Sequence, residues 1–428
     1  MEDEKEIAKE NELKVVNLIL KTWTSDVGGI FDYSTKSVIT VKDIIAESTY
    51  VIRDKTNHRI DNISQHSSIQ NTEDLLFHVI IDINNNYSLY NPIPKHLKLN
   101  SENLNYLNNK IWYVIKSEEA NEDDNCNEEY SISENDIIKF GKVKFAVQKI
   151  HFENENIEPA TPIKDSKKYN VSELNKDCPP VFDYEYIVDK EKIINIENID
   201  ENENKDEPKC ILCDKTRLNE DEEAETDRGD SLTLICLCNC KDKFVHLECL
   251  NSKKEEKNKE EKEEEKKEEE KEIDTSITLN NFQCRYCKAQ YPLKYKIIDK
   301  DNESKVFYTI EFKEPNSCDY MILESLDKMR DEQYCKSIHI VCLNKESITL
   351  GRGTDNNIVE TDISISRNHA IFYCDKNEGK IYLKNRSKKF GTSVLVRKEI
   401  SLLDKKIYLQ VGRTYIEAYR GINEDKSN

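Results

Sequence analysis

The sequence predicts a multidomain, mainly β protein in which a small metal-stabilised segment separates two β-rich regions. Three observations support this prediction. Short runs that alternate apolar and polar residues fill both ends of the chain, as expected of half-buried strands. Cysteines gather in the middle, in pairs with the spacing of metal ligands. The connecting stretches are polar and charged, as linkers are. A length of 428 residues allows two to four domains, at roughly 100–200 residues each.

The first β-rich region covers residues 1–150. Its runs "SVITVKDII", "LLFHVIIDI", "KIWYVIK" and "DIIKFGKVKFAVQKI" predict strands separated by turn-rich pieces. Tyr, Val and Ile dominate these runs, which suits the core of a β-sandwich. We find no reactive motif here, so we expect a role in packing or partner binding.

Two charged stretches connect the domains. Residues 151–205 are acidic and weakly patterned, and we interpret them as a linker with a short docked piece around "PPVFDYEYIVDKEKIINI". Residues 253–272 are a Lys/Glu-rich insert with i,i+4 charge pairs and no apolar stripe. Such a segment cannot bury a face, so we interpret it as a solvated, coiled-coil-like spacer.

The segment 206–296 carries the residues with metal-ligand chemistry. These form four pairs, with one further cysteine beside the second pair: Cys210 and Cys213; Cys236 and Cys238, with Cys240 nearby; His246 and Cys249; Cys284 and Cys287. A Cys-x-x-Cys pair brings two thiolates to one ion, and zinc takes four such ligands tetrahedrally. Eight ligands therefore predict two Zn²⁺ ions, which would stabilise a core too small to fold by apolar burial alone.

The order of the pairs resembles two zinc-finger families. With Cys236-x-Cys238, followed by seven residues that end in "FV" and then by His246, the segment resembles the RING-CH (RING-variant, C4HC3) family, and the ending "CRYCKAQYP" fits this family as well. With Cys236-x3-Cys240, followed by five residues and His246, it resembles the PHD finger, which also favours an aromatic residue such as Phe282 before the last pair. We favour the RING-CH interpretation, in which Cys240 is not a ligand.

The RING-CH resemblance implies a cross-braced arrangement of the two zinc ions. One zinc would bind Cys210, Cys213, His246 and Cys249, and the other would bind Cys236, Cys238, Cys284 and Cys287. Four protein ligands fill each tetrahedral ion, so both ions would be structural rather than catalytic. The charged insert lengthens one loop and leaves both sites intact, because loop-closure entropy grows slowly with length.

The same resemblance implies a partner for the finger. RING-type domains act in ubiquitin transfer by docking a ubiquitin-conjugating enzyme, and the positions that would form the docking face here are Ile211, Leu212, Lys288 and Pro292. The chain departs from the family in two respects. It lacks the Trp that usually precedes the last cysteine pair, and it lacks the transmembrane helices of the membrane-anchored relatives.

The second β-rich region covers residues 303–422, with its core at 335–422. Here "ITLGRGTDNNI", "DISISRNHAIFY" and "NRSKKFGTSVLV" follow one another, each beside a strand-like run. The three motifs resemble those of the forkhead-associated (FHA) domain, a β-sandwich that binds phosphothreonine peptides through loops at one end. The closing run "SENDIIKFGKVKFAVQKI" of the first region resembles the final strands of such a sandwich, so residues 1–150 are interpreted as a divergent FHA-like domain.

The FHA resemblance implies a phosphopeptide-binding site at Arg352, Ser366, Arg367 and Lys388. A phosphate dianion favours a guanidinium and hydroxyl donors, which these residues supply. His369 would brace the loop rather than act as a base. One departure matters: Phe390 stands where FHA domains usually carry an Asn whose amide grips the peptide main chain. A phenyl ring cannot make that contact, so Lys388 or Lys389 would supply charge instead.

Charge and targeting signals narrow the partners and the compartment. A formal net charge of -20 argues against broad nucleic-acid binding, which needs a basic surface. No apolar run is long enough for a membrane span. The charged start "MEDEKEIAKE" lacks an apolar signal core, so we expect a cytoplasmic or nuclear protein whose 14 cysteines stay reduced.

Two functional hypotheses follow. The first is an FHA-guided RING-type ubiquitin ligase, or a component of one, that selects a phosphorylated substrate. The second is a non-catalytic, phosphorylation-dependent adaptor with a structural zinc finger. We find no nucleophile–base constellation, no phosphate-cradling Gly-rich loop and no open metal site, so a conventional pocket enzyme is not expected.

Overall fold

The computed structural model contains strands along nearly its whole described length, which confirms the mainly β prediction. It describes residues 14–24, 31–35, 38–57, 59–66, 69–70, 73–84, 86–91, 93, 104–117, 129–153, 175, 186–189, 193–195, 208–215, 233–236, 240, 243–246, 249, 277–279, 284, 286–287, 294–298, 305–309, 318–326, 338–402 and 405–422. Among these residues, no helix has the length and hydropathy needed to cross a bilayer.

The N-terminal sandwich packs two five-strand layers. One layer has the order β25-β6-β5-β3-β4, and the other has the order β7-β26-β27-β1-β2. The bounds are β1 Lys14–Trp23, β2 Val38–Ile45, β3 Thr49–Asp54, β4 Ile60–Ile63, β5 Glu73–Ile81, β6 Tyr87–Tyr90, β7 Trp112–Ile115, β25 Ile400–Ser401, β26 Ile407–Val411 and β27 Thr414–Ile422. A 3-10 helix, η2 Leu104–Asn109, precedes β7.

The C-terminal sandwich has the same construction. One layer has the order β8-β23-β22-β20-β21, and the other has the order β24-β9-β10-β18-β19. The bounds are β8 Tyr130–Ile132, β9 Ile137–Phe140, β10 Val143–His151, β18 Tyr320–Ser325, β19 Ile338–Cys342, β20 Ser347–Gly351, β21 Ile358–Val359, β22 Ala370–Asp375, β23 Lys380–Asn385 and β24 Thr392–Leu395.

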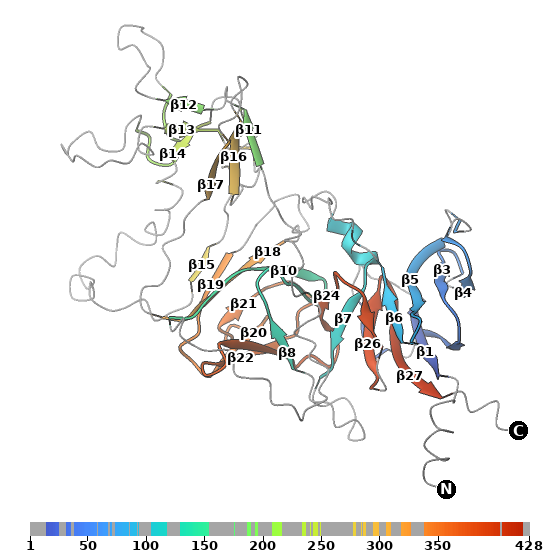
Figure 1. Cartoon of the computed structure of the whole chain (residues 1–428). Coiled ribbons are helices and arrows are strands. Elements are labelled where there is room, and N and C mark those ends of the chain that lie inside the picture. The colour runs from blue at the N-terminus through green and yellow to red at the C-terminus, as the bar shows by residue number, and fades with distance from the viewer. Residues whose placement is uncertain are drawn as a thin grey trace, which may run out of the picture.

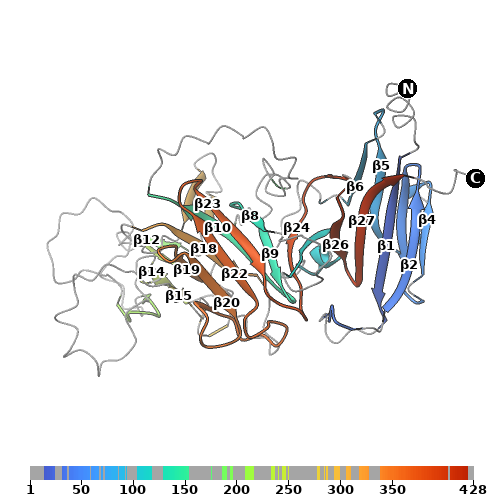
Figure 2. The same cartoon turned by 90° about the horizontal axis from the view of Figure 1, so that it is seen from below.

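The two sandwiches exchange their closing strands. In sequence, β8–β10 follow the strands of the N-terminal sandwich, yet they pair with β23, β24 and β18 of the C-terminal one. Conversely, β25–β27 follow β24 but pair with β6, β7 and β1. Figures 1 and 2 show the red arrows of β26 and β27 among blue strands, and the teal arrows of β8–β10 among orange ones. The strand pairings therefore run across residue 150, where the sequence suggested a domain boundary.

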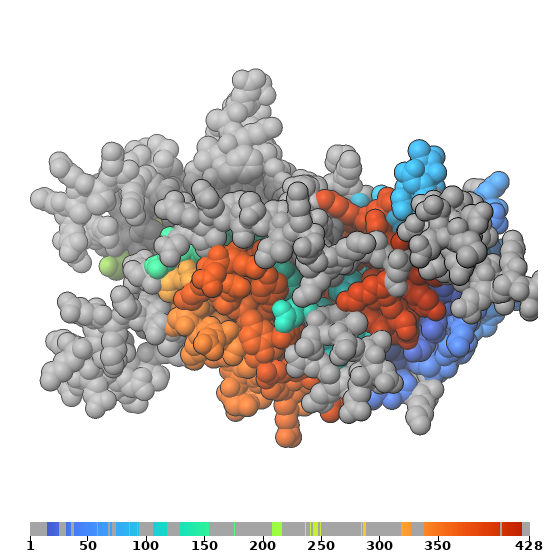
Figure 3. Space-filling model, turned by 60° about the horizontal axis from the view of Figure 1, so that its bottom comes forward, coloured from blue at the N-terminus to red at the C-terminus, as the bar shows by residue number. Residues whose placement is uncertain are grey.

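Strand β24 joins the two sandwiches into one continuous sheet. It pairs with β9 on one side and with β7 on the other, where Thr392 lies opposite Ile115 and Leu395 lies opposite Trp112. One hydrophobic core runs through both sandwiches, from Val16 in β1 to Ala418 in β27. In the space-filling view, the orange and red C-terminal residues continue into the blue N-terminal ones across one face (Figure 3).

Both exchanged hairpins turn at a glycine that the backbone requires. Gly141 between β9 and β10 has φ 61°, and Gly412 between β26 and β27 has φ 54°. Side chains other than glycine are strained in this left-handed region. The apolar strands flanking each turn bury their inward side chains, including Phe145 in β10 and Ile416 in β27, both fully buried.

The cysteine-rich segment lies between β10 and β18 in sequence and forms small sheets of its own (Figure 1). The first sheet contains β12 Ile193–Asn195, β13 Thr233–Ile235 and β14 Val245–His246, and the second contains β11 Tyr186–Asp189, β16 Lys294–Ile298 and β17 Lys305–Thr309. Part of the expected acidic linker therefore forms strands. β15 Ile277–Leu279, which precedes the last cysteine pair, adds to β19 of the C-terminal sandwich.

Candidate functional sites

Three loops meet at one end of the C-terminal sandwich, and they carry the motifs noted in the sequence. Gly351 ends β20, and the following Arg352 donates its backbone N–H to the Ser366 carbonyl (2.9 Å) and its Nε to the Ile365 carbonyl (3.2 Å). A Cβ at Gly351 would lie 2.2 Å from the Arg367 carbonyl oxygen, so the close approach of these two loops requires glycine. Arg352 is exposed, and its position beside Ser366 is fixed by the backbone.

His369 braces the second loop from inside the core. The Ser366 backbone N–H donates to His369 Nδ1 (2.9 Å), and the His369 carbonyl accepts from the Arg386 N–H (2.9 Å). Burial lowers the pKa of His369 to about 4, because the charged imidazolium would be desolvated. The ring is therefore neutral at pH 7 and holds the loop, in agreement with its expected bracing role.

The hydroxyls of the second and third loops meet directly. Ser366 Oγ lies 2.7 Å from Ser387 Oγ, and the Phe390 N–H donates to Ser387 Oγ (2.9 Å). Ser387 itself is held by Asn385, whose Oδ1 accepts from the Ser387 N–H (2.9 Å). The sequence interpretation did not assign Ser387 a role. The sequence feature that could have indicated such a role is a serine three residues before Phe390, in the loop that lacks the usual Asn.

The exchanged β9–β10 hairpin supports two of these loops. The Lys142 N–H donates to Ser364 Oγ (3.0 Å), and Lys142 Nζ lies 3.2 Å from Asp362 Oδ2. The Gly141 N–H donates to the Gly391 carbonyl (3.0 Å). The loops of the C-terminal sandwich therefore rest on a turn contributed from the first third of the chain.

A segment of the N-terminal sandwich clamps the third loop. The Tyr33 N–H donates to the Lys389 carbonyl (2.8 Å), and Lys389 Nζ lies 3.4 Å from Asp32 Oδ2. A Cβ at Gly391 would lie 2.7 Å from the Tyr33 ring, so the ring packs directly on this glycine. This clamp fixes the loop that carries Phe390, and Lys388 stays exposed on it.

The four residues predicted to bind phosphopeptide occupy the same end of the sandwich. The Ser366 carbonyl accepts a hydrogen bond from the Arg352 backbone N–H. The Ser366 hydroxyl bonds to that of Ser387, in the third loop, which also carries Lys388. Arg367 is exposed, and its carbonyl accepts from Gly353 N–H (3.0 Å) and from Asn356 Nδ2 (2.7 Å).

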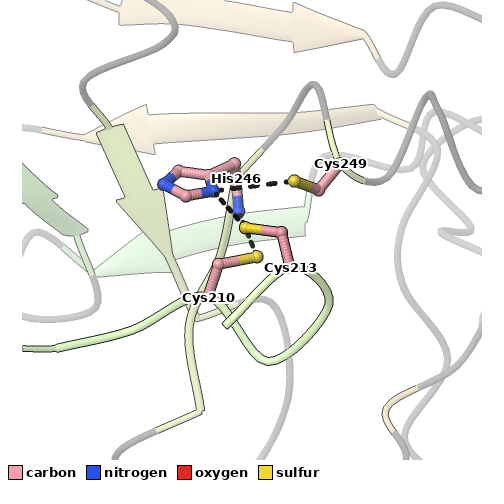
Figure 4. Close-up of side chains that lie close together, drawn as sticks. All are labelled: Cys210, Cys213, His246 and Cys249. Atoms are coloured by element: carbon pink, nitrogen blue, oxygen red, sulfur yellow. Dashed lines mark hydrogen bonds between the residues drawn. The ribbon is translucent and has the colours of Figure 1, made fainter. Parts of the chain in front are cut away.

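The first metal-ligand cluster is formed by Cys210, Cys213, His246 and Cys249, whose ligand atoms all lie within 4.8 Å of one another. The side chains converge on one point (Figure 4). His246 Nδ1 lies 3.4 Å from Cys213 Sγ and 3.6 Å from Cys249 Sγ. Tetrahedral zinc with ordinary Zn–S and Zn–N bonds would separate such atoms by roughly 3.6 Å, so the donor set fits zinc bound through Nδ1.

Backbone contacts hold the first cysteine pair against β14. The Ile211 N–H donates to the Phe244 carbonyl (2.9 Å), and the knuckle turns at Asp214, with φ 60°. The N–H groups of Leu212 and His246 donate to Cys210 Sγ at 3.5 and 3.4 Å. A hydrogen bond from Cys249, with those from His246, lowers the pKa of Cys210, which favours the thiolate form that a metal ligand needs.

The second cluster brings together Cys240, Cys284 and Cys287, again within 4.8 Å. Cys236 is fully buried, and its thiol donates to the Cys240 carbonyl (2.7 Å). Cys238 lies outside the described residues. The structure thus places Cys240, which the RING-CH interpretation leaves out, with the two cysteines of the last pair.

The expected docking positions for a conjugating enzyme are described only in part. Ile211 and Leu212 are half-buried on the first knuckle. Lys288 and Pro292, together with Phe282, lie outside the described residues. The predicted docking face therefore stays a prediction.

Comparison with known proteins supports the assignment of the C-terminal motifs. A search of curated proteins finds no match to this chain. The model of the FHA domain matches residues 348–414, a range that includes all three loops and ends in the exchanged strands β25 and β26. The matched range does not include the cysteine-rich segment. The chain therefore contains an FHA domain at residues 348–414.

Proposed function

We propose that this protein is a phosphorylation-dependent adaptor, which binds a phosphothreonine-containing partner at the FHA loops and also carries a structural zinc finger. An FHA domain is a phosphopeptide-binding module for protein interactions. The observation that carries the proposal is the pair of hydroxyls of Ser366 and Ser387, 2.7 Å apart, next to the exposed Arg352. A phosphate would accept from both hydroxyls and pair with the guanidinium.

Phosphothreonine peptides test this function directly. We expect Arg352→Ala or Ser366→Ala to weaken binding about tenfold or more, because each removes a charge-assisted hydrogen bond worth roughly 1.5–3 kcal/mol. Arg59→Ala is the matched control, since Arg59 is an exposed arginine on the N-terminal sandwich with 72% of its side chain accessible. Equal binding of phosphorylated and unphosphorylated peptides would overturn the proposal.

The zinc finger is proposed to hold two structural ions. The first would bind Cys210, Cys213, His246 and Cys249, and the second would bind Cys240, Cys284 and Cys287 with Cys236 as the fourth ligand. The register Cys236-x3-Cys240 is that of the PHD finger rather than RING-CH. It is supported by the grouping of Cys240 with the last pair and by the burial of Cys236 beside it.

Metal analysis distinguishes the two registers. With the PHD register, Cys240→Ser should reduce the zinc content from two ions to about one per chain, and Cys238→Ser should leave it unchanged. Cys374→Ser is the control, because Cys374 lies on β22, away from both clusters. The reverse pattern, with zinc lost in Cys238→Ser alone, would restore the RING-CH register.

The register also bears on the choice between adaptor and ubiquitin ligase. The ligase hypothesis depends on the RING-CH arrangement, whereas the grouping of Cys240 with Cys284 and Cys287 supports the PHD register. We therefore favour the adaptor, and we expect the purified protein to form no ubiquitin chains with a panel of conjugating enzymes. Chain formation that requires Leu212 would reverse this choice.

A further inference from the structure

A pocket of about 580 Å³ lies between the two sandwiches, at the edge of the FHA loops. We call it the inter-sandwich pocket. Its lining comes from β1 and β27 of the N-terminal sandwich, from the end of β7 and from the third FHA loop. Its volume lies in the range of ligand pockets, roughly 300–1,000 Å³. No FHA motif of the sequence accounts for this pocket, because most of its lining residues belong to the N-terminal sandwich.

Aromatic rings form one wall of the inter-sandwich pocket. Tyr33 packs edge-on against Trp23, with 5.2 Å between ring centroids, and edge-on against Tyr415, with 5.6 Å. Tyr33 is fixed at its far end, where its hydroxyl donates to Gln410 Oε1 (2.5 Å). The wall is therefore preorganised, so a ligand would not have to order these side chains on binding.

The charged groups of the lining are mostly cationic. Of the residues that the structure describes, Lys21, Lys116 and Lys388 line the pocket together with the carboxylate of Glu417. Lys21 Nζ lies 2.5 Å from Glu417 Oε1, and Lys116 Nζ lies 5.7 Å from the centre of the Tyr415 ring. Among the described residues, the lining therefore carries more cationic than anionic side chains, which favours an anionic occupant.

The pocket adjoins the proposed phosphate site. Ser387 lines the pocket and is also the partner of Ser366 Oγ in the loops. Neither Arg352 nor Ser366 is among the lining residues, so the pocket is a separate space that shares the third loop. A peptide whose phosphothreonine binds at Ser366 would therefore pass the mouth of the pocket within a few residues.

We propose that the inter-sandwich pocket binds a second anionic side chain of the same phosphopeptide, either a carboxylate or a second phosphate. This inference rests on the proposed phosphopeptide-binding function and makes it more specific. The lysines bind the negative charge, and the rings of Trp23, Tyr33 and Tyr415 pack on the carbon atoms that carry it. The missing Asn contact at Phe390 is then compensated by a second anchor, which the N-terminal sandwich supplies.

A peptide series tests the inference. The parent peptide carries one phosphothreonine among neutral residues, and each derivative adds one Glu or one phosphoserine at a single flanking position. We expect the second anion to raise the affinity about tenfold at one or two adjacent positions and to have little effect elsewhere. In Lys116→Met, the affinity of the best derivative should exceed that of the parent peptide by about threefold or less. Lys376→Met is the control, because Lys376 is an exposed lysine (60% accessible) of the C-terminal sandwich that does not line the pocket.

The outcomes separate this inference from the proposed function. If the parent peptide does not bind, the proposed function fails. If the parent binds but no position of the second anion raises the affinity, or if Lys116→Met leaves this gain in affinity unchanged, the pocket inference fails alone. If phosphoserine raises the affinity and Glu does not, the pocket prefers a second phosphate. If both raise it, the pocket accepts either a carboxylate or a phosphate. Each result supports the inference.

Discussion

Each sandwich of this protein places an arginine near the end of a corresponding strand, but the two guanidinium groups have opposite surroundings. Arg53 in β3 points into the N-terminal sandwich, where it pairs with Asp74 Oδ2 (2.6 Å) and donates to Thr414 Oγ1 (3.0 Å). Arg352, after β20, is exposed beside the Ser366 hydroxyl. Arg53 is thus an internal tie between strands, whereas Arg352 is exposed at the loops where we propose that phosphate binds.

The strand order of the two sandwiches agrees throughout. The layer β7-β26-β27-β1-β2 corresponds to β24-β9-β10-β18-β19, and β25-β6-β5-β3-β4 corresponds to β8-β23-β22-β20-β21. The N-terminal sandwich also clamps the third loop of the C-terminal one, through Asp32 and Tyr33.

The exchange of closing strands is tested by matched core substitutions. Phe145 in β10 and Ile416 in β27 are both fully buried. Phe145→Ala should destabilise the C-terminal sandwich by about 3–5 kcal/mol and Ile416→Ala the N-terminal one by about 2–5 kcal/mol, because each leaves a core cavity. Hydrogen exchange, followed region by region, measures the effect. Without the exchange, Ile416→Ala would loosen β20–β24 and Phe145→Ala would loosen β3–β6.

Acid should weaken the C-terminal sandwich before the N-terminal one. Burial lowers the pKa of both His339 and His369 to about 4, below the unfolded value of about 6.5. The unfolded chain therefore binds more protons between these values, so the stability that each histidine contributes is complete above pH 6.5 and is lost as the pH falls to 4. Each loss is worth about 3 kcal/mol. Burial raises the pKa of Asp136, which acts in the opposite direction, since its neutral form is favoured on folding.

Urea unfolding at a series of pH values measures this dependence. His339→Leu should reduce the slope of stability against pH between 6.5 and 4, because one of the two buried imidazoles is removed. In the N-terminal sandwich, burial also lowers the pKa of His78, but this residue is only half-buried. Replacing His78 should therefore change the slope less than replacing His339 does. An unchanged slope in His339→Leu would contradict this assignment.

The two turn glycines should respond differently to alanine. A Cβ at Gly141 would lie 2.2 Å from the backbone oxygen of Ser364, whereas a Cβ at Gly412 would meet Asn109 Oδ1 at 3.0 Å, a side-chain atom that can move. We expect Gly141→Ala to cost about 2–3 kcal/mol and to weaken phosphopeptide binding, because it displaces the second FHA loop. Gly412→Ala should cost about 1 kcal/mol and leave binding unchanged. Similar losses of binding in both variants would show that the hairpin does not support the loop locally.

The FHA motifs were predictable because each is local. The Gly351-Arg352 step, the Ser366–His369 spacing and the glycine at 391 each fix a loop by short-range geometry, and the FHA match confirms the domain. The exchange was not predictable from the same kind of evidence. The hairpins at 137–151 and 407–422 have equivalent alternation and an equivalent turn glycine, so either fits the edge of either sandwich. The choice depends on long-range packing, which periodicity does not encode.

The cysteine register was ambiguous for a related reason. Cys238 and Cys240 lie on the same stretch after β13, two residues apart, and both spacings to His246 occur in two-zinc fingers. Sequence spacing alone could not distinguish them. The position of the Cys240 sulfur near Cys284 and Cys287 is a contact over more than forty residues of chain, and only the fold brings it about.

The smallest expected difference concerns the ion pairs of the two sandwiches. In the N-terminal sandwich, Arg53 is buried, and removing its partner in Asp74→Asn leaves a guanidinium whose Nε already has no hydrogen-bond partner. We expect a loss of about 2 kcal/mol, below that of a fully buried pair because 20% of the Asp74 side chain is accessible. Asp362→Asn, which breaks the more exposed pair with Lys142, should cost at most about 1 kcal/mol. Adding salt should reduce the second effect and leave the first nearly unchanged, because a buried pair is screened less than a surface one. If both losses fell equally with salt, Arg53 would be solvated, and the contrast between the internal Arg53 and the exposed Arg352 would fail.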